Sequence, residues 1–207
     1  KTAGDIVVNQ KEIADTFFSD INNSLSVPIS KLNGIKEVHS LILGASPVEQ
    51  LPIVAIYGVS ENRFDSYVLQ EGDYPKAGEV ILGAKIYETL KRPKSIHVSK
   101  KEYPVSGVFK SSIGFEDGGV VMPLNDGGEL FHKSTSLFLI SLSDLGNSDA
   151  VVDQINALDT QIEAKTTDAF IDSYNQFKII ETSSDVIGVM AFMMGILGIV
   201  SMMSMVV

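Results

Sequence analysis

Three histidines are the side chains best suited to acid–base or metal chemistry near neutral pH, and their spacing argues against a shared site. They are His39, His97 and His132, with no HxxxH or HxH pairing, and the chain has no cysteine. A zinc site needs three or four nitrogen, sulfur or oxygen ligands gathered around one point. We therefore interpret each histidine as a surface or strand-edge residue and expect no metal site.

Motifs of covalent catalysis and of nucleotide binding are also missing from the sequence. It contains no GxSxG turn, no SxxK pair and no P-loop. The glycine-rich stretches EDGG (116–119) and NDGG (125–128) are interpreted as turns, because neither has the ligand spacing of a calcium loop. Asp117 and Asp126 are acids that could share a weak cation, but solvated carboxylates are the favoured interpretation. We expect no catalytic residue and no cofactor, so the chain is not predicted to be an enzyme.

The charge of the chain argues against a nucleic-acid partner. Its formal net charge is -10, whereas binding to phosphates relies on Lys and Arg. The densest basic group, Lys91–Lys94 with Lys100 and Lys101, has no interleaved aromatic residues and is interpreted as a solvated face.

An uncharged, mostly apolar segment, VIGVMAFMMGILGIVSMMSMVV, occupies residues 186–207, and every Asp, Glu, Lys and Arg lies before it. As a helix this segment would extend roughly 33 Å, against about 30 Å for the hydrocarbon core of a bilayer. We predict a transmembrane helix; the competing interpretation is the central helix of a soluble core. The first residue is Lys1 rather than Met, and we expect the chain to be a piece of a longer protein.

Small residues follow one face of this predicted span. They are spaced 3, 4 and 3 apart, at Gly188, Ala191, Gly195 and Gly198. Small side chains allow close approach of a second helix in lipid. We predict that this face packs against another span.

A helix is also predicted directly before the span, from a cap at Thr167 through a stalk at residues 168–185. Its apolar stripe has helical spacing, at Phe170, Tyr174, Phe177 and Ile180. No Pro or Gly interrupts residues 168–185, so stalk and span could form one rigid rod that transmits force. Alternatively, the polar residues 182–185 form a hinge at the membrane surface.

The remaining segments alternate between helical and strand patterns. Periodicity predicts a helix over 11–26, strands over 35–45 and 51–59, a strand over 136–143, a helix over 147–159 and a strand over 160–166. Between them, residues 60–133 contain short strands, many turns and one short helix over 83–92. The fold class is therefore α+β, in the order αββ, a β-rich insert, then βαβ.

Several of these stretches resemble the extracytoplasmic core domain of MacB/FtsX-type ABC-transporter permeases. They are LNGIKEVHSLI, IYGVSENRF, YPVSGVF, GGVVMPL, the start of the apolar tail, and EGDYPKAGEVILGAKIYETL, in which Gly72, Pro75, Glu79, Val80, Leu82 and Gly83 fit the family pattern. The chain departs from that pattern at Lys91–Lys94, where the family has a glycine-containing turn.

The resemblance implies a domain in two parts followed by a membrane anchor. The two parts are a porter-like α/β subdomain at 1–58 and 134–167 and a β-rich inserted subdomain at 59–133. The stalk at 168–185 and the span at 186–207 follow them. It implies residues 1–185 on the extracytoplasmic side of the plasma membrane, with membrane lipid around the span. The implied partners are a cytoplasmic ABC ATPase subunit, a second permease copy, and a substrate or partner protein outside. The alternative is a singly anchored surface module that binds a ligand or a protein; an anchored hydrolase ranks below both.

Overall fold

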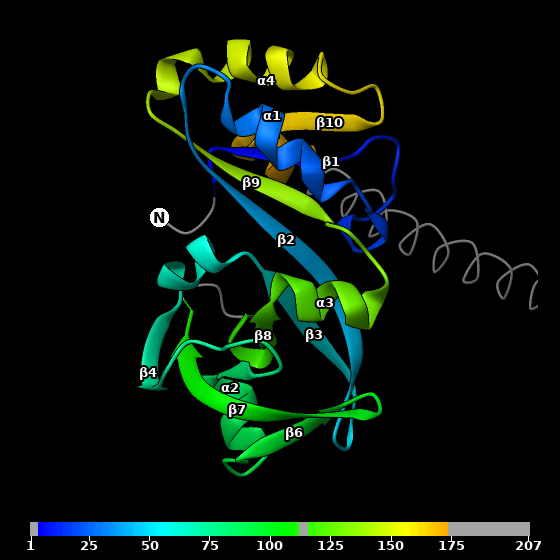
Figure 1. Ribbon diagram of the computed structural model, residues 1–207, viewed down its shortest axis with the longest axis vertical. Coiled ribbons are helices and arrows are strands. Elements are labelled where there is room, and N and C mark those ends of the chain that lie inside the picture. The colour runs from blue at the N-terminus through cyan, green and yellow to red at the C-terminus, as the bar shows by residue number, and fades with distance from the viewer. Residues whose placement is uncertain (1–3, 112–115, 174–207) are drawn as a thin grey trace, which may run out of the picture. The chain divides into compact units, whose positions relative to one another are not determined.

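The computed structural model of the chain describes residues 4–111 and 116–173. The chain divides into two units, Lys1–Thr166 and Thr167–Val207. The first unit has helices packed on a mixed β-sheet, which confirms the predicted α+β class (Figure 1).

The strands of the described residues form one ten-stranded sheet in the order β10-β1-β9-β2-β3-β8-β5-β7-β4, and β6 pairs with both β2 and β7. Neighbouring strands are antiparallel except for the pairs β3–β8 and β5–β7, which are parallel. The strands are β1 (Ile6–Gln10), β2 (Ile35–Val48), β3 (Leu51–Val59), β4 (Val68–Gly72), β5 (Val80–Gly83), β6 (Ser95–Val98), β7 (Lys101–Lys110), β8 (Val120–Pro123), β9 (Leu137–Leu142) and β10 (Ile162–Thr166).

Short helices cover parts of this sheet. Helix α4 lies against β10 and helix α1 against β2, whereas α3 lies against β2 and β3 (Figure 1). The α-helices of the first unit are α1 (Ser26–Ser30), α2 (Ala84–Thr89), α3 (Leu124–Phe131) and α4 (Ser148–Asn156). Single 3-10 turns occur at Thr16–Phe18, Asn23–Leu25, Glu116–Gly118 and Leu145–Asn147, and a longer 3-10 helix at Glu61–Ser66.

Two clusters of apolar side chains lie among the described residues of the first unit. The first cluster joins β1, β9 and β10 to α1 and α4, and includes Ile6, Ile29, Phe138, Ile140 and Ile155. The second cluster joins β3, β5, β6 and β8 to α2, and includes Ile56, Leu82, Ile86, Ile96 and Met122. Burial of large apolar side chains is the main stabilising contribution at both places.

Strand β2 takes part in both clusters. Val38 packs against the first cluster and Val48 belongs to the second. This strand is 14 residues long, so it runs roughly 45 Å. The predicted subdomain boundaries, 1–58 with 134–167 and 59–133, remain a prediction.

Strong local patterns are confirmed by the structure. The strands expected at 35–45, 51–59, 136–143 and 160–166 are β2, β3, β9 and β10, and the helix expected at 147–159 is α4. Strand β1 was not predicted. It pairs with β9 on one side and β10 on the other, and Ile6, Val7 and Val8 are all buried. A short strand buried on both faces lacks the alternation that identifies a strand from sequence.

The amphipathic helix predicted over 11–26 is wrong. The segment instead forms two 3-10 turns, because Asp15 accepts a hydrogen bond from the amide of Phe17 and Asn22 accepts one from the amide of Ser24. Phe18, placed on the apolar face by its spacing, is 76% exposed. Helix α1 begins only at Ser26.

The turn predicted at NDGG (125–128) is also wrong, because these residues lie inside α3. The glycines serve close packing: a Cβ on Gly127 would lie 2.9 Å from the Cα of Gly58 in β3. The EDGG stretch does contain a turn, the 3-10 turn Glu116–Gly118.

The departure from the family pattern at Lys91–Lys94 still forms a turn after α2. Lys91 and Arg92 adopt left-handed backbone angles, with φ of 61° and 58°. Their amides donate to the carbonyls of Glu88 and Tyr87, respectively. The chain thus closes this helix end with non-glycine residues, in a conformation that glycine adopts more easily.

In the second unit, residues 167–173 are helical, which confirms the start of the predicted helix. Within the described residues, no helix is both long enough and apolar enough to cross a bilayer. The predicted span at 186–207 lies outside the described residues.

Candidate functional site

A polar hollow of about 710 Å³ opens in the first unit where β1 and β2 begin, β9 ends and the 3-10 helix Glu61–Ser66 passes. Its lining contains acids, bases and one histidine, namely Asp5, Lys36, Glu37, His39, Arg63 and Asp65. Ser66, Ser141, Ser143 and Asn62 add hydroxyl and amide groups. The walls therefore offer both hydrogen-bond donors and acceptors, with charges of both signs.

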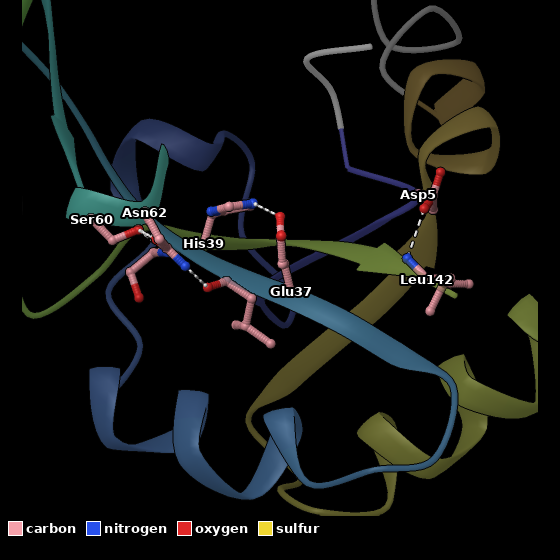
Figure 2. Close-up of polar contacts among 8 residues, drawn as sticks. Asp5, Glu37, His39, Ser60, Asn62 and Leu142 are labelled. Carbon is pink, nitrogen blue, oxygen red and sulfur yellow. Dashed lines mark hydrogen bonds and ion pairs between the residues drawn. The ribbon is translucent and has the colours of Figure 1, made fainter. Parts of the chain in front are cut away.

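Asp5 closes one end of the β1–β9 ladder at this hollow. Its amide donates to the carbonyl of Ile140 over 2.7 Å, and its Oδ2 accepts from the amide of Leu142 over 2.8 Å (Figure 2). A carboxylate that accepts from a backbone amide is held in one orientation. Asp5 thus fixes the wall that β9 contributes.

Glu37 and His39 form a pair on β2. They are two residues apart in a strand, so their side chains project from the same face. The Nε2 atom of His39 lies 3.3 Å from Oε2 of Glu37 (Figure 2). The His39 side chain is only 8% exposed, whereas that of Glu37 is 49% exposed. The pair thus joins a buried imidazole to a carboxylate in contact with water.

The start of the 3-10 helix Glu61–Ser66 is attached to β2 by a chain of hydrogen bonds. Ser60 Oγ accepts from the amide of Ser40 over 3.2 Å and donates to Asn62 Oδ1 over 2.7 Å. Asn62 Nδ2 then donates to the carbonyl of Val38 over 3.2 Å (Figure 2). These contacts hold Asn62 and the residues after it against the strand that carries His39.

Arg63 follows directly and is 5% exposed. Its guanidinium lies 6.0 Å from the centre of the Tyr67 ring, a distance that allows a cation–π interaction. Burial raises the pKa of Tyr67 to about 12, and the positive charge of Arg63 opposes that rise. The wall on this side therefore contains a buried cation next to a neutral phenol.

The structure corrects the interpretation of one histidine and confirms a surface position for His97 and His132. His39 is buried beside the hollow rather than at the surface. His97 is exposed on β6 and pairs with Glu49, with Nδ1 3.1 Å from Oε1. His132 ends α3 in a left-handed conformation.

No metal site is formed by the residues that the structure describes, where no three His, Asp or Glu side chains gather suitably. The acids considered for a shared cation have separate partners. Asp126 accepts from the amide of Gly78 over 2.8 Å, and Asp117 accepts from the amide of Ser111 over 2.6 Å.

The residues predicted for force transmission and helix packing are placed only in part. Phe170 lies in the described helix of residues 167–173. The other members of both sets lie outside the described residues, namely Tyr174, Phe177, Ile180, Gly188, Ala191, Gly195 and Gly198.

Sequence patterns did not predict the hollow, because its walls come from four segments that are distant in the chain. The only local signal is the Glu37–Val38–His39 triplet within a predicted strand, which puts an acid and a histidine on the same face. Burial of that histidine depends on β9 and on the 3-10 helix, neither of which adjoins it in sequence.

Comparison with known proteins agrees with the resemblance found in the sequence. The profile of the family described as "MacB-like periplasmic core domain" matches residues 3–158. No sequence among curated proteins matches the chain.

Solved structures with a similar fold include two from transporters. The periplasmic region of MacB from Actinobacillus actinomycetemcomitans superposes with a TM-score of 0.64 at 14% identity, covering 84% of this chain and 94% of that one. The extracellular domain of the noncanonic ABC-type transporter YknZ from Gram-positive bacteria gives 0.62 at 12% identity, covering 78% and 99%. A domain of a permease protein from Porphyromonas gingivalis gives 0.49 at 11% identity, covering 79% and 90%.

The two higher-scoring structures share the α+β fold of this chain over nearly their whole lengths. The family match includes β1, all residues that line the hollow and the whole of α4. The chain belongs to the MacB-like periplasmic core domain family of MacB/FtsX-type permeases.

Proposed function

We propose that this chain is the extracytoplasmic domain of an ABC-transporter permease subunit and that its C-terminal stalk helix couples cytoplasmic ATP hydrolysis to movement outside the membrane. In this proposal the chain catalyses no reaction itself. A separate ATPase subunit hydrolyses ATP, and a second permease copy completes the transporter. The movement either exports or extracts a substrate or activates a partner outside.

The observation that supports the coupling is that the second unit begins with helical residues. Strand β10 ends at Thr166, paired with Ile6 of β1, and residues 167–173 are helical. A helical segment is a stiffer spacer than a coil would be.

The test uses the complete permease with its ATPase in lipid vesicles. Because this chain has no cysteine, one spin label can be attached at the exposed Ile53 through Ile53→Cys, after any cysteines elsewhere in the permease are replaced. The distance between the labels of two permease copies is measured with and without trapped ATP. We expect the distance distribution to shift when ATP binds.

Asp172→Pro then tests the helix itself. Asp172 is exposed, so the substitution acts mainly by removing a backbone hydrogen bond of the helix. We expect the ATP-dependent shift to be lost while ATP hydrolysis continues, and the matched control Asp172→Ala to keep both. An unchanged shift in Asp172→Pro would overturn the coupling. Absence of any shift in the unsubstituted permease would instead favour the anchored binding module.

A further inference from the structure

A buried nitrogen of the polar hollow has no partner among the described residues. Nδ1 of His39 makes no hydrogen bond with any residue that the structure describes, although the side chain is only 8% exposed. Buried polar atoms in folded proteins nearly always have a partner, from the protein, from water or from a ligand. The hollow, which His39 lines, is where such a partner can enter.

The Glu37 contact decides what kind of partner Nδ1 needs. Because Nε2 faces the carboxylate of Glu37 at 3.3 Å, the proton of a neutral imidazole is on Nε2 and the lone pair is on Nδ1. A lone pair of this type accepts a hydrogen bond or binds a metal. Since the described residues gather no set of metal ligands, a hydrogen-bond donor is the fitting partner.

The charges around the hollow further restrict the ligand. Asp5, Glu37 and Asp65 offer carboxylates to a cationic donor, whereas Lys36 and Arg63 offer positive charge to an anion. A purely anionic ligand would meet the carboxylates, and a purely cationic one would meet the two bases. A ligand with one group of each sign pairs with both sets.

We infer that the hollow binds a small zwitterion carrying an ammonium and a carboxylate group, which is the chemistry of a free amino acid. The ammonium donates to Nδ1 of His39 and faces Glu37 and Asp65. The carboxylate faces Lys36 and Arg63. A volume of about 710 Å³ leaves room for a side chain on the ligand. This inference does not rest on the transport function.

The test observes the histidine nitrogens directly. The purified chain is labelled with ¹⁵N at its three histidines, and the imidazole signals are followed by NMR during titration with L-alanine. We expect a saturable shift of the Nδ1 signal of His39 and none for His97, which lies outside the hollow. Methylamine and acetate, which each carry one charge of the pair, should bind at least about tenfold more weakly.

Variants separate ligand binding from a general change of the fold. Lys36 is exposed, so Lys36→Gln should leave the folded spectrum unchanged and weaken alanine binding by about tenfold. Glu37→Gln should weaken alanine binding as well. Without the carboxylate, the neutral imidazole of His39 is no longer held with its proton on Nε2 and its lone pair on Nδ1. Glu49→Gln, which alters the other Glu–His pair, is the matched control and should bind alanine normally. No saturable shift with alanine, equal affinity for methylamine or acetate, or full binding by Lys36→Gln would each overturn the inference.

Discussion

At the scale of residues, the two Glu–His pairs found among the described residues differ in which partner is shielded from water. In one pair His39 is buried and Glu37 is half exposed. In the other, the His97 side chain is 57% exposed and the Glu49 side chain is 33% exposed. The same two residue types therefore form a binding wall in one place and a surface contact between segments in the other. Composition alone does not distinguish them, because burial is set by the strands packed around each pair.

Glu49 connects the β2–β3 turn to β6, and this contact should depend on pH. The amide of His97 donates to Glu49 Oε1 over 2.7 Å and, with the His97 ring, holds the pKa of that carboxyl below its ordinary value of 4.5. A lowered pKa in the folded state stabilises the fold above about pH 4.5, and this contribution is lost as the pH falls further. Glu49→Gln should therefore reduce the free energy of unfolding at pH 7 by about 0.5 kcal/mol and have a smaller effect at pH 3.

Urea unfolding at the two pH values measures this difference. Glu129→Gln is the control, because Glu129 is 75% exposed and lies 3.9 Å from Lys101, so its removal should have no measurable effect. An equal loss of stability at pH 7 and pH 3 for Glu49→Gln would show that the charge of Glu49 does not contribute.

At the scale of elements, the sequence identifies those segments whose local pattern and tertiary environment agree. Strands β2, β3, β9 and β10 and helix α4 were predicted, because each is long or has a clear apolar face. The helical spacing over 11–26 failed, because Asp15 and Asn22 accept hydrogen bonds from nearby amides and favour short turns. Helix α3 was missed, because two glycines favour a turn until the close contact with β3 is known.

Helix α3 gives a test in which two physical effects predict opposite signs. Replacing glycine by alanine in a helix normally stabilises it by about 1 kcal/mol. At Gly127, however, the new Cβ would lie 2.9 Å from the Cα of Gly58, and a backbone atom cannot move away easily. Gly127→Ala should therefore destabilise the first unit by about 1 to 2 kcal/mol, measured by thermal or urea unfolding.

Gly118→Ala is the matched control, because a Cβ there would meet no atom within 4 Å. We expect its stability to change by less than about 0.5 kcal/mol. A Gly127→Ala variant more stable than the unsubstituted chain would mean that α3 moves away from β3 at little cost, and that the glycines have another role.

At the scale of the whole first unit, one sheet connects two apolar clusters. Strand β2 contributes Val38 to the first cluster and Val48 to the second. Strand β3 is paired along most of its own length with residues 41–48 of β2. The family resemblance predicted two subdomains, and apolar segments from both ends of the first unit do meet in the first cluster. The hollow could not be predicted at this scale, because Asp5, His39, Arg63 and Leu145 approach one another only after the sheet has formed.

Sharing of β2 predicts that the two clusters unfold together rather than as separate subdomains. Ile140 lies in the first cluster and Ile56 in the second, and both side chains are fully buried. Ile140→Val and Ile56→Val make the same chemical change in each cluster, and each should lower the free energy of global unfolding by about 1 kcal/mol.

Hydrogen exchange followed by mass spectrometry reports β1 and β5 separately. If unfolding is cooperative, either variant reduces the protection of the slowest amides in both strands by the same amount, because those amides exchange only through global unfolding. A loss confined to β1 in Ile140→Val and to β5 in Ile56→Val would instead show that β2 is a hinge between independently stable subdomains.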